Sequence, residues 1–191
     1  MNDLLYGELV RLTAENPEVM ASHLFHWDQD TEWYRLLDTE PPMPFSEKKV
    51  KEWFEKDLEK PPSDELFFGI RMLEGDVLIG FIGLFDLFQQ HGDALVAIAL
   101  GERQYWGNGY GTDAMRIMLR YAFNELNLRK AGLIVFEYNP RAIRSYEKVG
   151  FIHEGRIRGA MLREGRRWDW LYMGLLREEF LANQAGIVGR K

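Results

Sequence analysis

Three glycines at alternate positions, Gly107, Gly109 and Gly111, lie between an apolar stretch and a segment with helical periodicity. Glycine lets the backbone adopt positive φ and approach a ligand closely. The first turn of a helix has backbone N–H groups without intrahelical partners, and the helix dipole adds partial positive charge there. The loop therefore predicts a phosphate site that needs no basic side chain. We expect Asp113, at the start of the helix, to point away from such a phosphate.

The sequence of this loop restricts the kind of phosphate ligand. It lacks the Gly-Lys-Ser/Thr of a P-loop nucleotide site. Gly109-x-Gly111-x-x-Ala114 fits a permissive dinucleotide fingerprint, with Glu137 as the acid for a ribose, so a dinucleotide-binding oxidoreductase is one alternative. That alternative requires βαβ units around the loop, whereas the segments before it predict an antiparallel meander.

The segments that position the loop alternate between strand and helix signals. Apolar residues spaced three and four apart from Met115 to Leu126 predict one buried helical stripe. Asn139 and Pro140 are typical of a helix start, and Gly150 is typical of a helix end. We predict strands over residues 8–12, 66–73, 77–87 (bulged near Gly80 or Gly83), 94–101, 131–138, 151–162 and 167–176, and helices over 15–37 (broken near 28–30), 46–60, 112–126 and 140–149. This order predicts a mixed α/β (α+β) sheet.

The composition excludes several classes of site. The 191 residues carry a formal net charge of −6 and include no cysteine. Disulfides, thiolate metal sites and a cysteine nucleophile are therefore excluded. We see no signal peptide and no run of about 20 apolar residues, so we expect one cytoplasmic domain over residues 1–191 with no membrane or nucleic-acid partner. His23 and His26 share a predicted helix face without further ligands, so we expect no metal site.

Two segments resemble the signature motifs of the GNAT superfamily of N-acetyltransferases. The segment Trp106-Gly-Asn-Gly-Tyr-Gly-Thr-Asp-Ala114 resembles motif A, and Asn139-Pro-Arg-Ala-Ile-Arg-Ser-Tyr-Glu-Lys-Val-Gly-Phe151 resembles the second signature. The pattern is similar to the branch that contains ribosomal-protein N-terminal and spermidine acetyltransferases. The resemblance implies a mostly antiparallel sheet that splays at its centre, with flanking helices. It also implies an acetyl-CoA-binding core over about 66–177 and an acceptor region over about 13–60.

The alignment of the loop to the family pattern leaves two registers open. The pattern begins with Gln or Arg, and the register that keeps Gly111 at the helix start places Trp106 there. A shift by two residues places Gln104 there instead, with Gly107 and Gly109 as the glycines. We prefer the first register because it brings Gly111 to the mouth of the helix.

The resemblance implies how acetyl-CoA is held. The strand over 94–101 is expected to splay from the strand over 131–138, with the pantetheine arm in the gap. Backbone groups of Ala99, Leu100 and Gly101 are expected to pair with that arm. The diphosphate is expected on Trp106, Gly107, Asn108, Gly109, Tyr110, Gly111 and Thr112. The pantetheine and nucleotide side is expected on Asn139, Ala142, Arg144 and Tyr146.

The implied reaction moves the acetyl group of acetyl-CoA onto a primary amine, such as a protein N-terminus or a polyamine. Tyr146 is expected to be the general acid that protonates the departing thiolate. Without cysteine, an acetyl-cysteine intermediate cannot form, which favours direct transfer in a ternary complex. Glu102 is the predicted general base and Glu137 is an alternative, but we favour a solvated charge for each, with solvent or an acid of the substrate site as the other candidate base.

The acceptor side is less determined by the sequence. Trp33 and Tyr34 are expected to bind the substrate, and Asp28, Asp30 and Glu32 to attract a cation. The alternative is a packed helix junction with a wet acidic edge. The resemblance also leaves open a homodimer and a non-catalytic module that only binds acyl-CoA.

Overall fold

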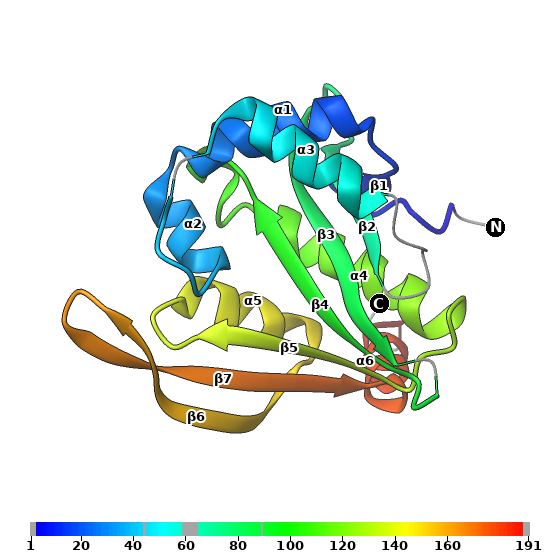
Figure 1. Ribbon diagram of the computed structural model, residues 1–191. Coiled ribbons are helices and arrows are strands. Elements are labelled where there is room, and N and C mark those ends of the chain that lie inside the picture. Colours follow the sequence, from blue (N-terminus) through cyan, green and yellow to red (C-terminus); the bar gives the residue numbers. More distant parts are fainter. Residues whose placement is uncertain (1–2, 44, 59–64, 89, 189–191) are drawn as a thin grey trace.

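The computed structural model describes residues 3–43, 45–58, 65–88 and 90–188. Within these ranges, seven strands form one sheet in the order β1-β2-β3-β4-β5-β7-β6 (Figure 1). Their bounds are Val10–Thr13 (β1), Leu66–Met72 (β2), Leu78–Phe88 (β3), Asp93–Leu100 (β4), Lys130–Phe136 (β5), Ile152–Arg163 (β6) and Arg166–Leu176 (β7).

The sheet is antiparallel at every pair of neighbours except β4 and β5. These two strands run parallel and pair only between Asp93–Leu95 and Lys130–Gly132. Beyond that short ladder they diverge, and Figure 1 shows the wedge between them. The expected mixed, mostly antiparallel, splayed sheet is therefore confirmed. A doubly wound parallel sheet is absent from the described residues, so the dinucleotide-binding alternative is wrong.

Helices cover both faces of the sheet. Their bounds are Pro17–Asp28 (α1), Thr31–Leu37 (α2), Glu47–Leu58 (α3), Tyr110–Asn124 (α4), Pro140–Val149 (α5) and Arg177–Val188 (α6). On one face, Met20, Trp27 and Trp33 from α1 and α2 pack against Phe81 and Ala99 of the sheet. On the other face, the buried stripe of α4 packs into the main core. None of the described helices has the length and apolarity needed to span a membrane.

Most local predictions are confirmed, and the differences occur at element ends. Asn139 accepts from the backbone N–H of Ala142 at the start of α5, and Gly150 ends that helix with φ 113°. The irregular register of β2 and β3 lies beside Gly80, as expected. The first strand begins at Val10 rather than residue 8, and α4 begins at Tyr110 rather than residue 112. The single turn Arg103–Tyr105 and helix α6 were not predicted, and the expected end of α3 at Lys60 lies outside the described residues.

Asp113 anchors the N-terminal strand to helix α4. Its carboxylate accepts from the backbone N–H groups of Glu8, Leu9 and Val10 at 3.2, 2.7 and 3.0 Å. The side chain is buried and lies against Gly7, where a Cβ atom would come within 2.3 Å of Oδ2. The carboxylate therefore points to the segment that begins β1, in agreement with the expectation that it is not directed to a ligand at the loop.

Removing this carboxylate is expected to destabilise the fold. Asp113→Ala leaves three backbone donors without their acceptor, and we expect a loss of about 2–4 kcal/mol in the free energy of unfolding, measured by urea denaturation. Glu18→Ala is the control, because Glu18 forms an exposed ion pair with Lys51 (2.6 Å) whose loss should change the free energy of unfolding far less. Equal losses in the two variants would contradict the anchoring role.

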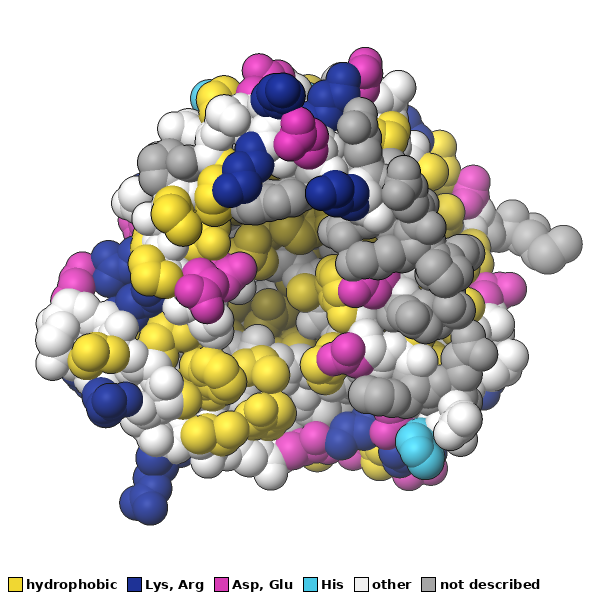
Figure 2. Space-filling view, viewed as in Figure 1, with side chains coloured by type: hydrophobic (Ala, Val, Ile, Leu, Met, Phe, Trp, Pro, Cys, Tyr) yellow, Lys and Arg dark blue, Asp and Glu magenta, His cyan; other side chains and the backbone are white. Residues whose placement is uncertain are grey.

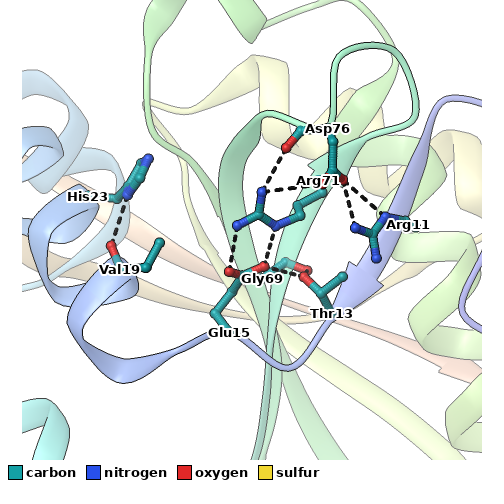
Figure 3. A network of polar contacts seen from close by, with 8 residues as sticks. All are labelled: Arg11, Thr13, Glu15, Val19, His23, Gly69, Arg71 and Asp76. Atoms are coloured by element: carbon teal, nitrogen blue, oxygen red, sulfur yellow. Dashed lines mark hydrogen bonds and ion pairs between the residues drawn. The ribbon is translucent and has the colours of Figure 1, made fainter.

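A second polar network holds the start of α1 against the sheet (Figure 3). Arg71 on β2 donates from Nε and Nη2 to the two carboxylate oxygens of Glu15 at 2.6 and 2.7 Å. The same guanidinium donates to the carbonyl of Asp76, whose side chain pairs with Arg11. Arg71 holds the pKa of the Glu15 carboxyl below its usual range. The network fixes the chain just before α1 against β2.

Candidate active site

The divergence of β4 and β5 opens a pocket of about 410 Å³. Figure 2 shows that this face of the molecule is hollowed and that hydrophobic side chains line the hollow. The lining comprises Trp33, Leu36, Leu37, Val96–Leu100, Trp106, Gly107, Gly109, Gly111, Thr112, Ile134–Phe136, Asn139, Arg141, Ala142, Arg144, Ser145, Tyr146 and Lys148. Parts of β4, β5, α2, α5 and the glycine loop therefore meet at one site.

The charged side chains that line the pocket are all positive. Arg141, Arg144 and Lys148, all on α5, are the charged residues of the described lining, and none of the lining residues is a carboxylate. A pocket of this kind favours an anionic ligand.

The glycine loop delivers free backbone donors to the pocket. Gly107 and Gly109 have φ values of 80° and 91°, which residues other than glycine rarely adopt. Gly109 caps helix α4, and the first intrahelical bond runs from the N–H of Asp113 to the carbonyl of Gly109 (3.0 Å). The amides of residues 110–112 therefore lie in the first turn, where no intrahelical acceptor is available. These donors and the helix dipole form a site suited to a phosphate.

Gly111 has a different role from the other two glycines. It lies inside α4, and a Cβ atom there would meet only Leu100 and Ile98 at ordinary contact distances of 3.7 and 3.8 Å. The fold therefore tolerates a side chain at this position. We therefore expect that glycine is needed here for a ligand to approach the amide closely, and not for folding.

We therefore expect Gly111→Ala to separate binding from stability. The thermal midpoint should stay within about 2 °C of wild type, because the added methyl group causes no clash. The dissociation constant for acetyl-CoA, measured by calorimetry, should rise about 10-fold because the methyl group occupies space beside the amide. An unchanged dissociation constant would show that close approach at Gly111 is not required.

The end of β4 presents only part of its backbone to the pocket. The N–H of Gly101 donates to the carbonyl of Ile79 on the β3 side (2.9 Å). Since hydrogen-bonding direction alternates along an antiparallel strand, Ala99 also pairs with β3 and Leu100 faces away from it. The carbonyl of Leu100 accepts from the indole Nε1 of both Trp33 (3.0 Å) and Trp106 (2.9 Å). Of the three backbone positions expected to pair with the pantetheine arm, Leu100 alone is directed to the gap.

Tyr146 lies on the pocket wall in helix α5. Its ring contacts Phe151 edge-on, with ring centroids 6.1 Å apart, and packs against the main core. Burial raises the pKa of Tyr146 to about 12. The phenol is therefore protonated at neutral pH and can donate a proton to an atom in the pocket. Its role as the general acid stays a prediction.

Five of the predicted site residues are absent from the pocket lining. They are Gly101, Glu102, Asn108, Tyr110 and Tyr34. The carboxylate of Glu102 accepts from the side-chain amide of Gln104 (2.6 Å), and Asn108 donates to the carbonyl of Gln104 (2.8 Å). The role of Glu102 as the general base stays a prediction that this placement does not support.

The alternative base and the acidic acceptor residues have other partners. Glu137 accepts from the backbone N–H of Asp169 (3.2 Å) and does not line the pocket. Asp30 and Glu32 both pair with Arg103, at 2.6 and 2.7 Å. Asp28 makes no ion pair within the part of the chain that the structure describes, and burial raises the pKa of its carboxyl.

Several residues that line the pocket were not predicted from the sequence. Arg141, Ser145 and Lys148 line it from α5, and the hydroxyls of Ser145 and Thr112 are hydrogen-bonded at 2.8 Å between α5 and α4. The helical spacing of Arg141, Arg144, Ser145 and Lys148 places them on one face of α5, which was a usable signal. The contact of Arg141 with Trp106 had no such signal, because it joins residues 35 positions apart in the sequence (141 against 106).

Known proteins resemble this chain in sequence and in fold. The family model described as "Acetyltransferase (GNAT) domain" matches residues 9–152. The SPbeta prophage-derived uncharacterized N-acetyltransferase YokL of Bacillus subtilis is 33% identical over 177 residues, which cover 93% of this chain and 95% of that protein. The spermidine N(1)-acetyltransferase of Vibrio cholerae is 32% identical over 104 residues, covering 54% of this chain and 60% of that protein.

Solved structures agree on the architecture. The crystal structure of spermidine N-acetyltransferase from Vibrio cholerae in complex with CoA and spermine has a TM-score of 0.79 to this chain. It is 24% identical and covers 90% of this chain and 98% of that chain. At this identity the likeness shows the fold.

Proposed function

Because this chain belongs to the acetyltransferase (GNAT) family, and is an N-acetyltransferase that uses acetyl-CoA, we propose that it transfers the acetyl group in one direct step with Tyr146 as the general acid. The pocket supports acetyl-CoA as the bound donor. It offers unpaired amides at the start of α4 and a positive lining for phosphates, and a narrow apolar gap between β4 and β5 for a pantetheine arm. This combination is the observation that carries the proposal.

The proposed reaction exchanges one bond of the carbonyl carbon for another. The amine nitrogen forms a bond to the carbonyl carbon of the thioester, and the carbon–sulfur bond breaks. The departing thiolate takes the phenol proton of Tyr146, and the proton that the amine loses restores the phenol through solvent. The absence of cysteine from the sequence supports this direct route, because no acetyl-cysteine can form.

The acceptor is proposed to be a primary amine that enters beside helix α2. The spermidine acetyltransferases among the relatives support a polyamine. Asp28, Asp38 and Glu40 lie close enough to Tyr34 to raise the pKa of its phenol, after burial as the main cause, and these acids favour a cation there. A protein N-terminus is the other acceptor of this class. The region over about 13–60 is the proposed acceptor side, and a cytoplasmic location is proposed with it.

Release of the free thiol from acetyl-CoA tests this proposal. The protein is assayed with a panel that contains spermidine, spermine, a peptide with a free N-terminus and a single amino acid. Amine-dependent thiol release, with an acetylated product of the expected mass, would support the transferase. Tight acetyl-CoA binding without turnover on any amine would favour a non-catalytic acyl-CoA-binding module. Failure to bind acetyl-CoA would overturn the proposal.

A further inference from the structure

Arg141 is a cation in the pocket wall without a carboxylate partner. Among the described residues, its side chain makes no ion pair, whereas Arg11, Arg71 and Arg103 each pair with an acid. Its guanidinium carbon lies 3.8 Å from the centroid of the Trp106 ring, in a cation–π contact. The side chain is part-buried, and its contact with Trp106 joins helix α5 to the start of the glycine loop in the pocket wall.

The surroundings of Arg141 do not satisfy its charge. Burial lowers the pKa of Arg141, and the nearby Glu32 and Tyr146 act in the opposite direction. Glu32 itself is paired with Arg103 at 2.7 Å. A partly desolvated cation without a hydrogen-bonded anion is costly, and the indole face compensates only part of that cost. The arrangement is therefore suited to a ligand that brings an anion.

The position of Trp106 indicates which end of the ligand that anion is on. Trp106 is held by the hydrogen bond from its Nε1 to the carbonyl of Leu100 (2.9 Å). It opens the loop whose unpaired amides lie at the start of α4. Arg141 on its ring therefore contacts the first residue of the loop that leads to those amides. A guanidinium presents paired N–H donors that match the oxygens of a phosphate, whereas backbone amides alone carry no full charge.

We infer that Arg141, positioned by the ring of Trp106, binds the diphosphate of acetyl-CoA and supplies the positive charge that the glycine loop lacks. This inference rests on the proposed acetyl-CoA site. It also gives a function to the aromatic residue at position 106, because the flat indole orients the guanidinium toward the amides of the loop.

The test compares three acetyl thioesters that differ in their phosphates. Acetyl-CoA carries both the diphosphate and a 3′-phosphate, its 3′-dephospho form keeps only the diphosphate, and S-acetylpantetheine carries neither. Dissociation constants are measured by calorimetry for wild type, Arg141→Met and Arg141→Lys. We expect Arg141→Met to weaken acetyl-CoA and the 3′-dephospho form by the same factor, about 10- to 100-fold, and to leave S-acetylpantetheine unchanged. Arg141→Lys should recover part of the loss.

The control variant is Arg166→Met. Arg166 lies over the ring of Trp168 at the same distance, 3.8 Å, on strand β7 outside the pocket lining. The Arg166→Met substitution removes an equivalent cation–π contact and should leave all three dissociation constants unchanged. Thermal midpoints of both methionine variants show that each one folds.

Three results would overturn the inference. One is unchanged binding of acetyl-CoA by Arg141→Met, and another is equal weakening of all three thioesters. The third is a loss confined to the form with the 3′-phosphate. If wild type itself fails to bind acetyl-CoA, the proposed function fails instead, so the two failures are distinguishable.

Discussion

Replacing Tyr146 with phenylalanine should lower kcat for amine-dependent thiol release by about 100-fold while leaving the dissociation constant of acetyl-CoA nearly unchanged. The substitution removes only the phenol oxygen, so the ring still packs against Phe151. What is lost is the proton donor for the departing thiolate. Because that donor acts on the leaving group in the transition state, the loss should appear in kcat rather than in substrate binding.

Tyr121→Phe is the matched control for this prediction. Tyr121 is a part-buried tyrosine on α4 that packs edge-on against Phe68 and does not line the pocket. Its hydroxyl can be removed without touching the reaction, so kcat should stay within about 2-fold of wild type. A Tyr146→Phe variant that keeps wild-type kcat would contradict the general-acid role and leave packing as the function of the ring.

The raised pKa of Tyr146 adds a pH dependence to the same prediction. A phenol with a pKa of about 12 stays protonated through pH 10, so its titration should not reduce kcat below that pH. For stability, the folded-state pKa lies above the ordinary value of 10, so the folded protein holds the proton more tightly. That contribution to stability is present below pH 10 and is lost as the pH rises toward 12. Urea denaturation of wild type and Tyr146→Phe from pH 8 to 11 would show the difference.

The parts of the fold that the sequence predicts are those set by local interactions. Asn139, Pro140 and Gly150 define α5 because each acts on backbone groups within a few residues of itself. The stripe from Met115 to Phe123 defines the buried face of α4 for the same reason. The start of that helix was predicted two residues late, because Tyr110 and Gly111 follow a glycine-rich sequence that is typical of a loop. The structure shows that Gly109 is the N-cap, in a left-handed conformation, so the helix begins at Tyr110.

The geometry of the site depends on contacts that no local pattern contains. The carbonyl of Leu100 accepts from Trp33 and Trp106, which were assigned to the acceptor side and to the cofactor loop. The two tryptophans are thus joined at one backbone atom, and only the tertiary structure brings them there. For the same reason, Ala99, Leu100 and Gly101 were all predicted to pair with the ligand, although strand pairing directs the backbone of only Leu100 to the gap.

Gly101 shows how such a contact fixes a residue type. It follows β4 and is buried directly against the indole of Trp27, where a Cβ atom would lie 2.0 Å from Cε2 and 2.1 Å from Nε1. Trp27 is itself 3% exposed, packed in the cluster that joins α1 and α2 to the sheet, and its ring cannot move aside without opening that cluster. Packing against Trp27 of helix α1 is therefore sufficient to require glycine at this position.

Gly101→Ala should accordingly lower the free energy of unfolding by about 3 kcal/mol, because overpacking forces the indole or the strand end to shift. Gly111→Ala, where the added methyl group meets no clash, provides the comparison at nearly unchanged stability. The double variant Gly101→Ala with Trp27→Leu distinguishes the cause. If the clash is with the indole, the two stability losses should be less than additive by at least about 1 kcal/mol. Additive losses would show that Gly101 is needed for its backbone conformation and not for the space that Trp27 occupies.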